Sequence, residues 1–409
     1  MAGRYQAPKG TFDVLPELSA IRAAIYLAGT TAFARAGYGR IETPIFEDTE
    51  LFARAVGEAT DIVRKEMFTF EDLGGRSLTL RPEATAPICR AYVEHGMHKL
   101  AQPVKLWCYG PFFRYEAPQA GRFRQFTQID VEAIGSDSPL VDAEQVILLD
   151  EFLRGLGIEG IRLRLSSLGS AESRKEYRGE LREYLRVHED ELAREVRERI
   201  DSNPLRAFDA DDPNTQAVMA EAPRMIDRLA DDDAAHFAAV RGLLDDIGVT
   251  YGLDGTLVRG LDYYTRTVFE FESDRLGAQS ALGGGGRYDG LVGELGGPET
   301  PACGWAAGVE RIVLAMPEAE PTARADVFIA ASDEHRGRAF ALAVELRRAG
   351  IAADLDLAGR SLKCQMKQAD RLGAEKAVIL AEDGAVSLRD MSSGEQREIE
   401  LEKITEELR

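Results

Sequence analysis

The chain has 409 residues, a formal net charge of −20 and 44% hydrophobic residues. Its length predicts about two or three domains of roughly 150 residues each, and its apolar fraction excludes a largely disordered protein. The acidic balance excludes a generally basic coat for nucleic acid, although a local basic face would suffice for a nucleic-acid partner.

The four cysteines are scattered and form no CxxC pair, so the sequence indicates neither a zinc site nor a disulfide framework. Free cysteines fit a reducing cytoplasm. The N-terminal stretch MAGRYQAPKGTFDVLPE lacks the apolar core of a secretory signal, and no run of about 18 apolar residues occurs that would cross a membrane. We therefore expect a cytoplasmic protein with no metal site.

The first elements predict an α+β part with an antiparallel sheet. Apolar residues at helical spacing predict a helix over 19–36, from a Ser19 cap to the glycine that follows. A hairpin is predicted over 68–83, with its turn at Leu-Gly-Gly. Two longer strands are predicted over 104–116 and 124–135, and the loop APQAGR joins them.

The second half of the chain changes character. Residues 168–245 are dense in charge and have amphipathic spacing, which predicts a helical insertion. Sheet patterning then resumes and ends in a helix predicted over 304–316. The segment PEAEPTAR, 317–324, is a linker by composition. Alternating strand and helix signals predict a small, partly parallel α/β domain over 325–409, with one helix at 360–373.

The strand predicted over 124–135 has a polar and an apolar face, because alternate residues of a strand share a face. Its polar face is either exposed to solvent or lines a pocket. Arg114 ends the partner strand, where it either forms a surface ion pair with Glu116 or binds phosphate through its planar guanidinium. The polar face comprises Arg124, Phe126, Gln128, Asp130 and Glu132, and the other face Thr127, Ile129 and Val131.

Two glycine-containing segments are ambiguous when taken singly. GWAAGVERIVLAM, 304–316, places Arg311 in the first turns of a helix, where it either serves a site or lies in solvent. ALGGGGRYDGL, 281–291, has four consecutive glycines, which indicate close backbone approach or only a tight turn. This segment is neither a phosphate-binding P-loop nor a dinucleotide fingerprint, because it lacks the GK[ST] ending and the GxGxxG spacing.

The stretch LVRGLDYYTRTVFEF has the composition of a strand, yet Arg259 stands before the pair Tyr263–Tyr264. Five segments occur in the order LTLRPEATA, GPFFRYEAPQAGRFRQFTQIDVE, LVRGLDYYTRTVFEF, ALGGGGRYDGL and GWAAGVERI. Together they resemble the signature segments of the histidyl-tRNA synthetase family, within the class II aminoacyl-tRNA synthetases. The resemblance runs from GTFDVLPE, 10–17, into the C-terminal domain.

The resemblance implies a class II catalytic domain over 1–167 and 246–318, interrupted by the insertion, and a C-terminal anticodon-binding domain. It implies that ATP and Mg²⁺ activate L-histidine to histidyl-adenylate with release of pyrophosphate. Histidine is then transferred to the 3′-terminal adenosine of the histidine tRNA. Residues 38–60 resemble the class II dimer-forming segment, which implies a symmetric homodimer.

The matching positions also imply roles for individual residues. ATP would be bound by Arg114 and Arg259 on opposite sides of the α-phosphate, both catalytic, and by Arg311 near the γ-phosphate. The α-amino group of histidine would be held by Glu83, Thr85 and Gln128, and the imidazole by Glu132 and Tyr264, with Tyr263 and Tyr288 shaping the pocket. The tRNA would contact Gln119 and Arg122 in the loop, and Arg360, Lys363, Lys367 and Arg371.

The last four residues fall within about 80° on one face of the predicted helix, at about 100° per residue. From the residues alone this face is either solvated or binds tRNA. The sequence departs from the family pattern at Ala84, where a glycine is usual, and at Ala117 and Ala120, where the loop usually carries cations. The loss of these two cations changes the loop's contact with the acceptor end, where most histidine tRNAs carry an extra 5′ guanosine.

Two alternative functions remain to be weighed. A synthetase-like regulatory paralogue of histidine biosynthesis would lack aminoacylation, but such paralogues generally lack the anticodon domain that this chain keeps. A class II synthetase for another amino acid would not need LVRGLDYYTRTVFEF. In that stretch Arg259 and Tyr264 have opposite parity, so a regular strand would split them. We therefore predict a turn or bulge over 260–263 and a strand that begins near Tyr264.

Overall fold

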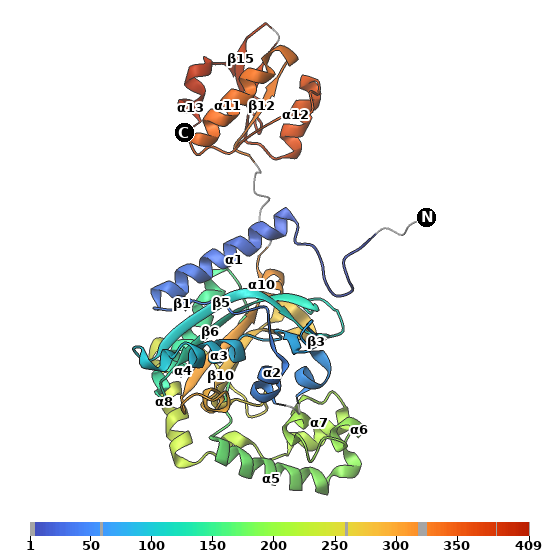
Figure 1. Cartoon of the computed structure of the whole chain (residues 1–409), viewed down its shortest axis with the longest axis vertical. Helices are drawn as coiled ribbons and strands as arrows, with labels where there is room; N and C mark the ends of the chain where they lie inside the picture. Colours follow the sequence, from blue (N-terminus) through green and yellow to red (C-terminus); the bar gives the residue numbers. More distant parts are fainter. Residues whose placement is uncertain (1–4, 58–59, 258–260, 318–324, 382, 409) are drawn as a thin grey trace. The chain divides into compact units, whose positions relative to one another are not determined.

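The computed structural model describes residues 5–57, 60–257, 261–317, 325–381 and 383–408. The chain forms two compact units, Met1–Pro317 and Glu318–Arg409 (Figure 1). Within the described ranges, no helix has the length and apolar content needed to cross a membrane.

A large, mainly antiparallel sheet forms the centre of the first unit (Figure 1). The two long predicted strands are confirmed as β5 and β6, which pair antiparallel along their whole length. Short parallel strands close the two edges, and the strand at 161–167 was not predicted. In the described residues the order is β1 (Gly39–Arg40), β5 (Val104–Phe113), β6 (Gln125–Ile134), β11 (Ala302–Gly308), β10 (Ala281–Arg287), β9 (Thr265–Ser273), β7 (Ile161–Ser167) and β8 (Gly252–Leu253).

Three helices cover one face of this sheet and share a core with it: α1 (Pro16–Arg35), α4 (Pro139–Gly155) and α8 (Asp231–Ile247). The first helix begins at Pro16 and not after Ser19, whose backbone N–H already donates to the carbonyl of Leu15. Proline favours this first position because its missing N–H costs no helical hydrogen bond. The helix ends before Gly37, whose φ of +84° suits glycine.

The opposite face carries α2 (Thr49–Val56), α3 (Thr85–Glu94) and α9 (Leu291–Glu294), which pack with the sheet in a second core. A small three-stranded sheet also belongs to this unit, in the spatial order β2 (Phe46–Asp48), β4 (Ser77–Leu80) and β3 (Phe68–Glu71). The predicted hairpin over 68–83 is confirmed as β3 and β4.

The four glycines at 283–286 form the middle of β10 and not a turn. Close approach is their role: a Cβ on Gly285 would lie 2.5 Å from the Cα of Trp305, and one on Gly286 would lie 2.9 Å from Cγ1 of Val268. The predicted helix over 304–316 is also corrected, because residues up to Gly308 belong to β11. Only α10 (Val309–Ala315) is helical.

The charged segment forms α5 (Ala171–Val187), α6 (Arg194–Arg197) and α7 (Pro213–Ala220) around a small core of its own. The insertion predicted over 168–245 also contains most of α8. The apolar residues Phe237, Val240 and Leu244 of this helix belong to the core of the large sheet. We therefore place the insertion proper before Asp231.

The second unit has a five-stranded sheet in its described part, with two parallel and two antiparallel pairings, as predicted for a partly parallel α/β domain. The predicted helix over 360–373 is shorter. The elements are β12 (Val327–Ala331), α11 (Arg336–Arg348), β13 (Ala353–Leu355), α12 (Leu362–Arg371), β14 (Lys376–Leu380), β15 (Val386–Asp390), β16 (Gln396–Glu398) and α13 (Ile404–Glu407).

Candidate functional site

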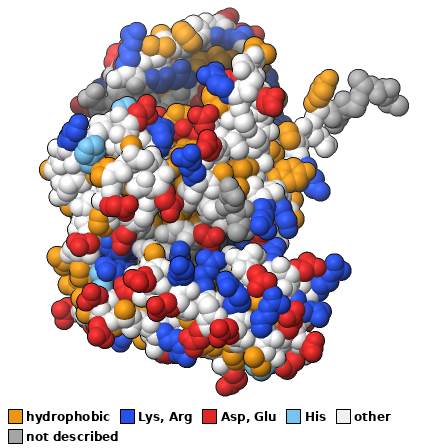
Figure 2. Space-filling view, turned by 60° about the horizontal axis from the view of Figure 1, so that its bottom comes forward, with side chains coloured by type: hydrophobic (Ala, Val, Ile, Leu, Met, Phe, Trp, Pro, Cys, Tyr) orange, Lys and Arg blue, Asp and Glu red, His pale blue; other side chains and the backbone are white. Residues whose placement is uncertain are grey.

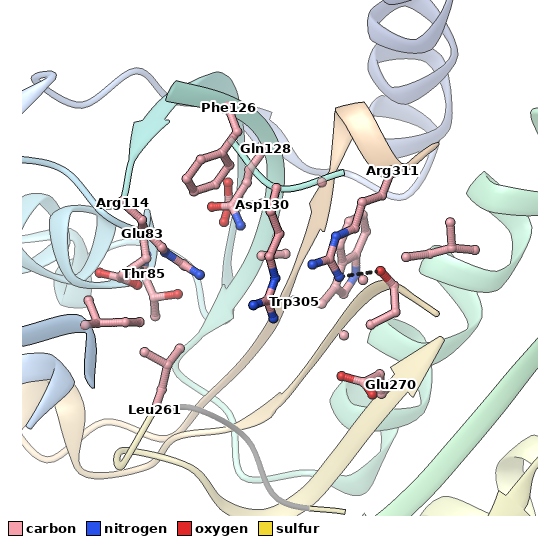
Figure 3. A pocket seen from close by; sticks show the side chains of 18 of the residues that line it. Glu83, Thr85, Arg114, Phe126, Gln128, Asp130, Leu261, Glu270, Trp305 and Arg311 are labelled. Atoms are coloured by element: carbon pink, nitrogen blue, oxygen red, sulfur yellow. Dashed lines mark hydrogen bonds between the residues drawn. The ribbon is translucent and has the colours of Figure 1, made fainter. Parts of the chain in front are cut away.

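A cavity of about 660 Å³ lies in the first unit against β6, β11, β10 and the start of β9. Figure 3 shows Glu83, Thr85 and Arg114 toward one end of it and Arg311 and Glu270 toward the other. Most of the residues that the sequence assigned to the two substrates therefore meet in one pocket.

The polar face of β6 lines this cavity, so the solvent-exposed alternative is wrong. Phe126, Gln128 and Asp130 face the pocket (Figure 3), whereas Ile129 and Val131 lie in the core. The Oε1 atom of Gln128 is buried and has no hydrogen-bond partner among the described residues. A buried acceptor without a donor is costly, so this atom is available to a ligand N–H group.

Glu132 lies on the same strand face but does not line the cavity. Its Oε1 accepts a hydrogen bond from Oγ1 of Thr85 at 2.7 Å, and its Oε2 accepts one from the hydroxyl of Tyr288. Burial raises the pKa of Glu132 to about 8. Glu132 therefore fixes two residues that do line the cavity, Thr85 and Tyr288, and its direct contact with imidazole stays a prediction.

The N-terminus of α3 supplies the next part of the wall. The Glu83 carboxylate accepts the backbone N–H groups of Thr85 at 2.8 Å and Ala86 at 3.0 Å. It therefore satisfies orphan donors at a helix N-terminus, where a negative charge is favourable. Burial is the largest influence on this carboxyl and raises its pKa. Ala84, which stands where the family usually has glycine, is fully buried.

Arg114 follows β5 directly and points into the cavity (Figure 3). Its Nε donates to the carbonyl of Pro82 at 2.9 Å, and its guanidinium lies over the ring of Phe126 at 5.3 Å. The alternative surface pair with Glu116 is not formed; Glu116 pairs with Arg122 at 3.3 Å. Arg114 is thus held in place by uncharged partners, which leaves its charge for an anion.

The side chain of Arg311 extends from α10 into the cavity, so the alternative of a solvent-exposed arginine on a helix surface is wrong. Its Nη1 donates to the carbonyl of Ala281 at 2.8 Å, and its Nε donates to that of Gly121 at 3.2 Å. Burial, and then the charge of Arg122, lower the pKa of Arg311. A buried arginine close to a second arginine is stabilised when an anion binds between them.

Three tyrosines form the remaining wall. The ring of Tyr263 lies 4.7 Å from that of Tyr264 and 5.6 Å from that of Tyr288, measured between centroids. All three are buried. Asp262 and Tyr263 form a turn and β9 begins at Thr265, in agreement with the predicted turn. Arg259 lies outside the described residues.

The insertion also reaches this site. Arg174 of α5 donates from Nη2 to the carbonyl of Asp262 at 2.8 Å and from Nη1 to that of Tyr264. Arg206 and Phe208, on the same insertion, line the cavity. The sequence analysis missed these residues because their charged, amphipathic segment has the pattern of any solvated helix.

Arg164, Asp130 and Glu270 were also missed as pocket residues. Strand alternation carried a signal for Asp130, which shares a face with Gln128. Arg164 and Glu270 come from β7 and β9. These strands are neighbours in the sheet but distant in the sequence, so local patterns could not predict their contact.

The predicted tRNA contacts fall in two places. Gln119 and Arg122 pair through their backbones in the loop between β5 and β6. In the second unit Lys363, Lys367 and Arg371 are exposed on α12. Arg360 is not on this helix, and its Nε donates to Asp356 at 2.6 Å. The predicted basic face of the helix therefore has three residues, and Arg360 lies before the helix begins.

Comparison with known proteins gives concordant matches. The family model of histidyl-tRNA synthetase matches residues 10–312, and that of the anticodon-binding domain matches 326–409. Histidine–tRNA ligase of Rubrobacter xylanophilus is 50% identical over 97% of this chain and 96% of that protein. Apo S. aureus histidyl-tRNA synthetase has a TM-score of 0.83 and 37% identity, covering 99% of this chain and 100% of that one.

A weaker likeness concerns a Bacillus halodurans protein described as an ATP phosphoribosyltransferase regulatory subunit/histidyl-tRNA synthetase. It has a TM-score of 0.69 and 25% identity, covering 93% of this chain and 99% of that one. The higher identity to the ligases favours the catalytic function over the regulatory one.

Proposed function

The chain belongs to the histidyl-tRNA synthetase family and is a class II histidine–tRNA ligase, and we propose that histidine and ATP react in the 660 Å³ pocket. One observation carries this proposal: hydrogen-bond acceptors and tyrosines line a single cavity together with Arg114 and Arg311, which lie toward opposite ends of it (Figure 3). Such a lining fits a small amino acid beside a triphosphate, because the arginines would bind the phosphate charges.

At the histidine end, we assign Glu83, Thr85 and Gln128 to the α-amino group. Glu132 and Tyr264 would bind the imidazole, and Tyr263 and Tyr288 would shape the pocket around it. Hydroxyl groups both donate and accept, as the two nitrogens of a neutral imidazole require. A site that must satisfy such groups rejects analogues that lack them by large factors.

At the ATP end, we assign Arg114 and Arg259 to the α-phosphate and Arg311 to the γ-phosphate. The histidine carboxylate attacks the α-phosphorus, an acyl–phosphate bond forms, and the bond to pyrophosphate breaks. The carboxylate is already ionised, so no protein base is required. Arginines held in advance stabilise the negative charge that develops without reorganisation. Each charge pair at about 4 Å is worth roughly 4 kcal/mol at an effective dielectric near 20, before desolvation.

The donor set fits a magnesium ion that ATP carries with it. Mg²⁺ is usually bound through substrate phosphates, waters and one or two carboxylates. Glu270 offers a carboxylate in the pocket, and the described residues contain no cluster of three metal-ligating side chains. Glu270 would hold the ion, which would neutralise phosphate charge when bound.

The partners proposed beyond the pocket are tRNA and a second copy of the chain. The apolar side chains Phe46 and Phe70 of the small sheet are 51% and 42% exposed, and their rings lie 6.2 Å apart. Exposed apolar clusters mark association surfaces, which supports a homodimer through the segment 38–60. For tRNA, we propose contacts from the loop with Gln119 and Arg122 and from the α12 face. We place the enzyme in the cytoplasm with its substrates.

ATP–pyrophosphate exchange with each of the twenty amino acids tests the pocket assignment, and we expect histidine alone to stimulate it. Aminoacylation of the histidine tRNA then separates the ligase from a regulatory paralogue. Exchange driven by another amino acid, or by none, contradicts the proposal.

A further inference from the structure

The carboxylates around the histidine end of the pocket differ in what they bind. Two backbone N–H groups hold Glu83, and two hydroxyl groups hold Glu132. Among the described residues, Asp130 accepts one side-chain hydrogen bond, from the weak S–H donor of Cys108 with Sγ–Oδ2 at 3.6 Å. Asp130 is only 1% exposed and yet lines the cavity. Its capacity to accept hydrogen bonds is therefore the least used of the three.

A second acceptor lies beside Asp130 on the same strand face. Gln128 is two residues away on β6, and its buried Oε1 lacks a partner within the described chain. Figure 3 shows both side chains on the cavity wall, with Glu83 opposite them. Asp130 and Gln128 therefore provide hydrogen-bond acceptors to a ligand, and the matching ligand group must be a hydrogen-bond donor.

An ammonium group is the part of a histidine molecule that meets this demand, because it donates three hydrogen bonds and accepts none. A neutral imidazole presents one donor and one acceptor, which suits the tyrosine hydroxyls. A buried carboxylate also needs a positive charge, since an unpaired buried charge is strongly unfavourable. Arg114 is already held by Pro82 and Phe126.

We propose that Asp130 is a specificity-determining residue that binds the α-ammonium group of histidine together with Gln128. This role rests on the proposed function of the pocket and extends it, because neither the sequence motifs nor the family match assigns Asp130. Burial, and then the charge of Glu83, raise the pKa of Asp130 to about 8, although the charges of Arg81 and Arg114 act in the opposite direction.

The test uses the full-length chain and two competitive inhibitors of ATP–pyrophosphate exchange. L-Histidinol keeps the α-ammonium group, and imidazolelactate replaces it with a hydroxyl. In Asp130→Asn we expect the KM for histidine and the Ki for histidinol to rise about 10- to 100-fold, the scale of a charge-assisted hydrogen bond. The Ki for imidazolelactate should stay within about twofold. Asp137→Asn, an exposed aspartate beyond the same strand, is the matched control.

Equal increases for both inhibitors would overturn the proposal, because they would place Asp130 against the imidazole or in a structural role. A loss confined to kcat would assign it to the ATP end and would also overturn it. If wild-type chain gave no histidine-dependent exchange, the proposed function itself would fail.

A measurement on the unmodified protein covers the case in which the variant does not fold. Asp130 faces Cys108 of β5, Glu83 before α3, and Arg81 and Arg114, and of these Glu83 also has a raised pKa. Each inhibition constant is first corrected for the separately measured ionisation of its inhibitor, because the α-ammonium group gives histidinol a lower imidazole pKa than imidazolelactate. Binding of histidinol relative to imidazolelactate should tighten severalfold from pH 6 to pH 8, as Asp130 ionises. A ratio that stays flat over this range contradicts the pairing.

Discussion

Replacing Gly304 with alanine should damage histidine binding through Glu132. The two residues are register partners on β11 and β6. A Cβ at Gly304 would lie 2.5 Å from Cδ of Glu132 and 2.6 Å from the carbonyl oxygen of Val131. Carbon atoms pack at about 3.5–4.0 Å, and the Val131 carbonyl is fixed in the centre of a sheet. The carboxylate must therefore retreat by at least about 1 Å.

That retreat separates the carboxylate from Thr85 and Tyr288, both of which line the pocket. A misplacement of about 1 Å can cost on the order of 100-fold in rate, and overpacking costs about 1–3 kcal/mol of stability. We expect Gly304→Ala to raise the KM for histidine in ATP–pyrophosphate exchange at least about tenfold, with a much smaller change in the KM for ATP.

Gly242→Ala is the matched control, because a Cβ there meets nothing within 4 Å in the middle of α8. Alanine should raise its free energy of unfolding by up to about 1 kcal/mol and leave both KM values unchanged. If Gly304→Ala bound histidine as the wild type does, the network around Glu132 could not be what positions the pocket wall.

Three further predictions address the insertion, the second unit and the core. Arg174→Ala should weaken histidine binding by about 1.5–3 kcal/mol, seen as a higher KM for histidine with an unchanged KM for ATP. Arg174→Lys should retain part of the histidine binding. Equal increases of both KM values would contradict this prediction. Lys363→Glu with Lys367→Glu should raise the KM for tRNA in aminoacylation and leave exchange unchanged, whereas unaltered tRNA kinetics would refute the contact. Asp142→Asn, which breaks the buried pair with Arg287, should lower the free energy of unfolding by about 3–5 kcal/mol, measured in urea.

The pair between Asp142 and Arg287 also predicts a pH dependence. Burial alone would raise the pKa of Asp142, but the hydrogen bond from His236 and the charge of Arg287 lower it overall. A depressed folded-state pKa contributes stability above the unfolded value of about 3.9 and loses it as pH falls through the folded value. The stability difference between wild type and Asp142→Asn should therefore shrink below about pH 4, and a constant difference would show that charge is not its cause.

The sequence predicted those features that depend on residues close together in the chain. Strand alternation placed Gln128 and Asp130 on one face, and the helix stop at Gly37 and the hairpin over 68–83 depend on turn chemistry. The strand at 304–308 was read as a helix because its small residues have no strong preference; its strand conformation comes from pairing with β6 and β10 on both sides. Strand parity and the family resemblance assigned Glu132 to the pocket, whereas the hydroxyl groups that hold it come from Thr85 and Tyr288, which are distant in sequence.

A bulge in β9 fixes the start of the strand that follows Tyr264. Between Val268 and Thr265 the pairing with β10 slips by two residues, and Arg266 lies there with a φ of +46°. For a residue other than glycine this costs about 1–2 kcal/mol, so neighbouring contacts must fix it. Its N–H donates to Gly169 at 2.6 Å, its carbonyl accepts from Leu168 at 2.7 Å, and its Nε donates to Asp233 at 3.0 Å.

These anchors flank the two ends of the insertion. Gly169 precedes α5, Asp233 belongs to α8, and Arg174 of α5 grips the carbonyls just before the bulge. The turn at 262–263 places Tyr264 before the first residue of β9, so Tyr264 is not part of a regular strand. The insertion is therefore coupled to the cavity wall: a change that loosens α5 should also loosen Tyr263 and Tyr264, which line the cavity.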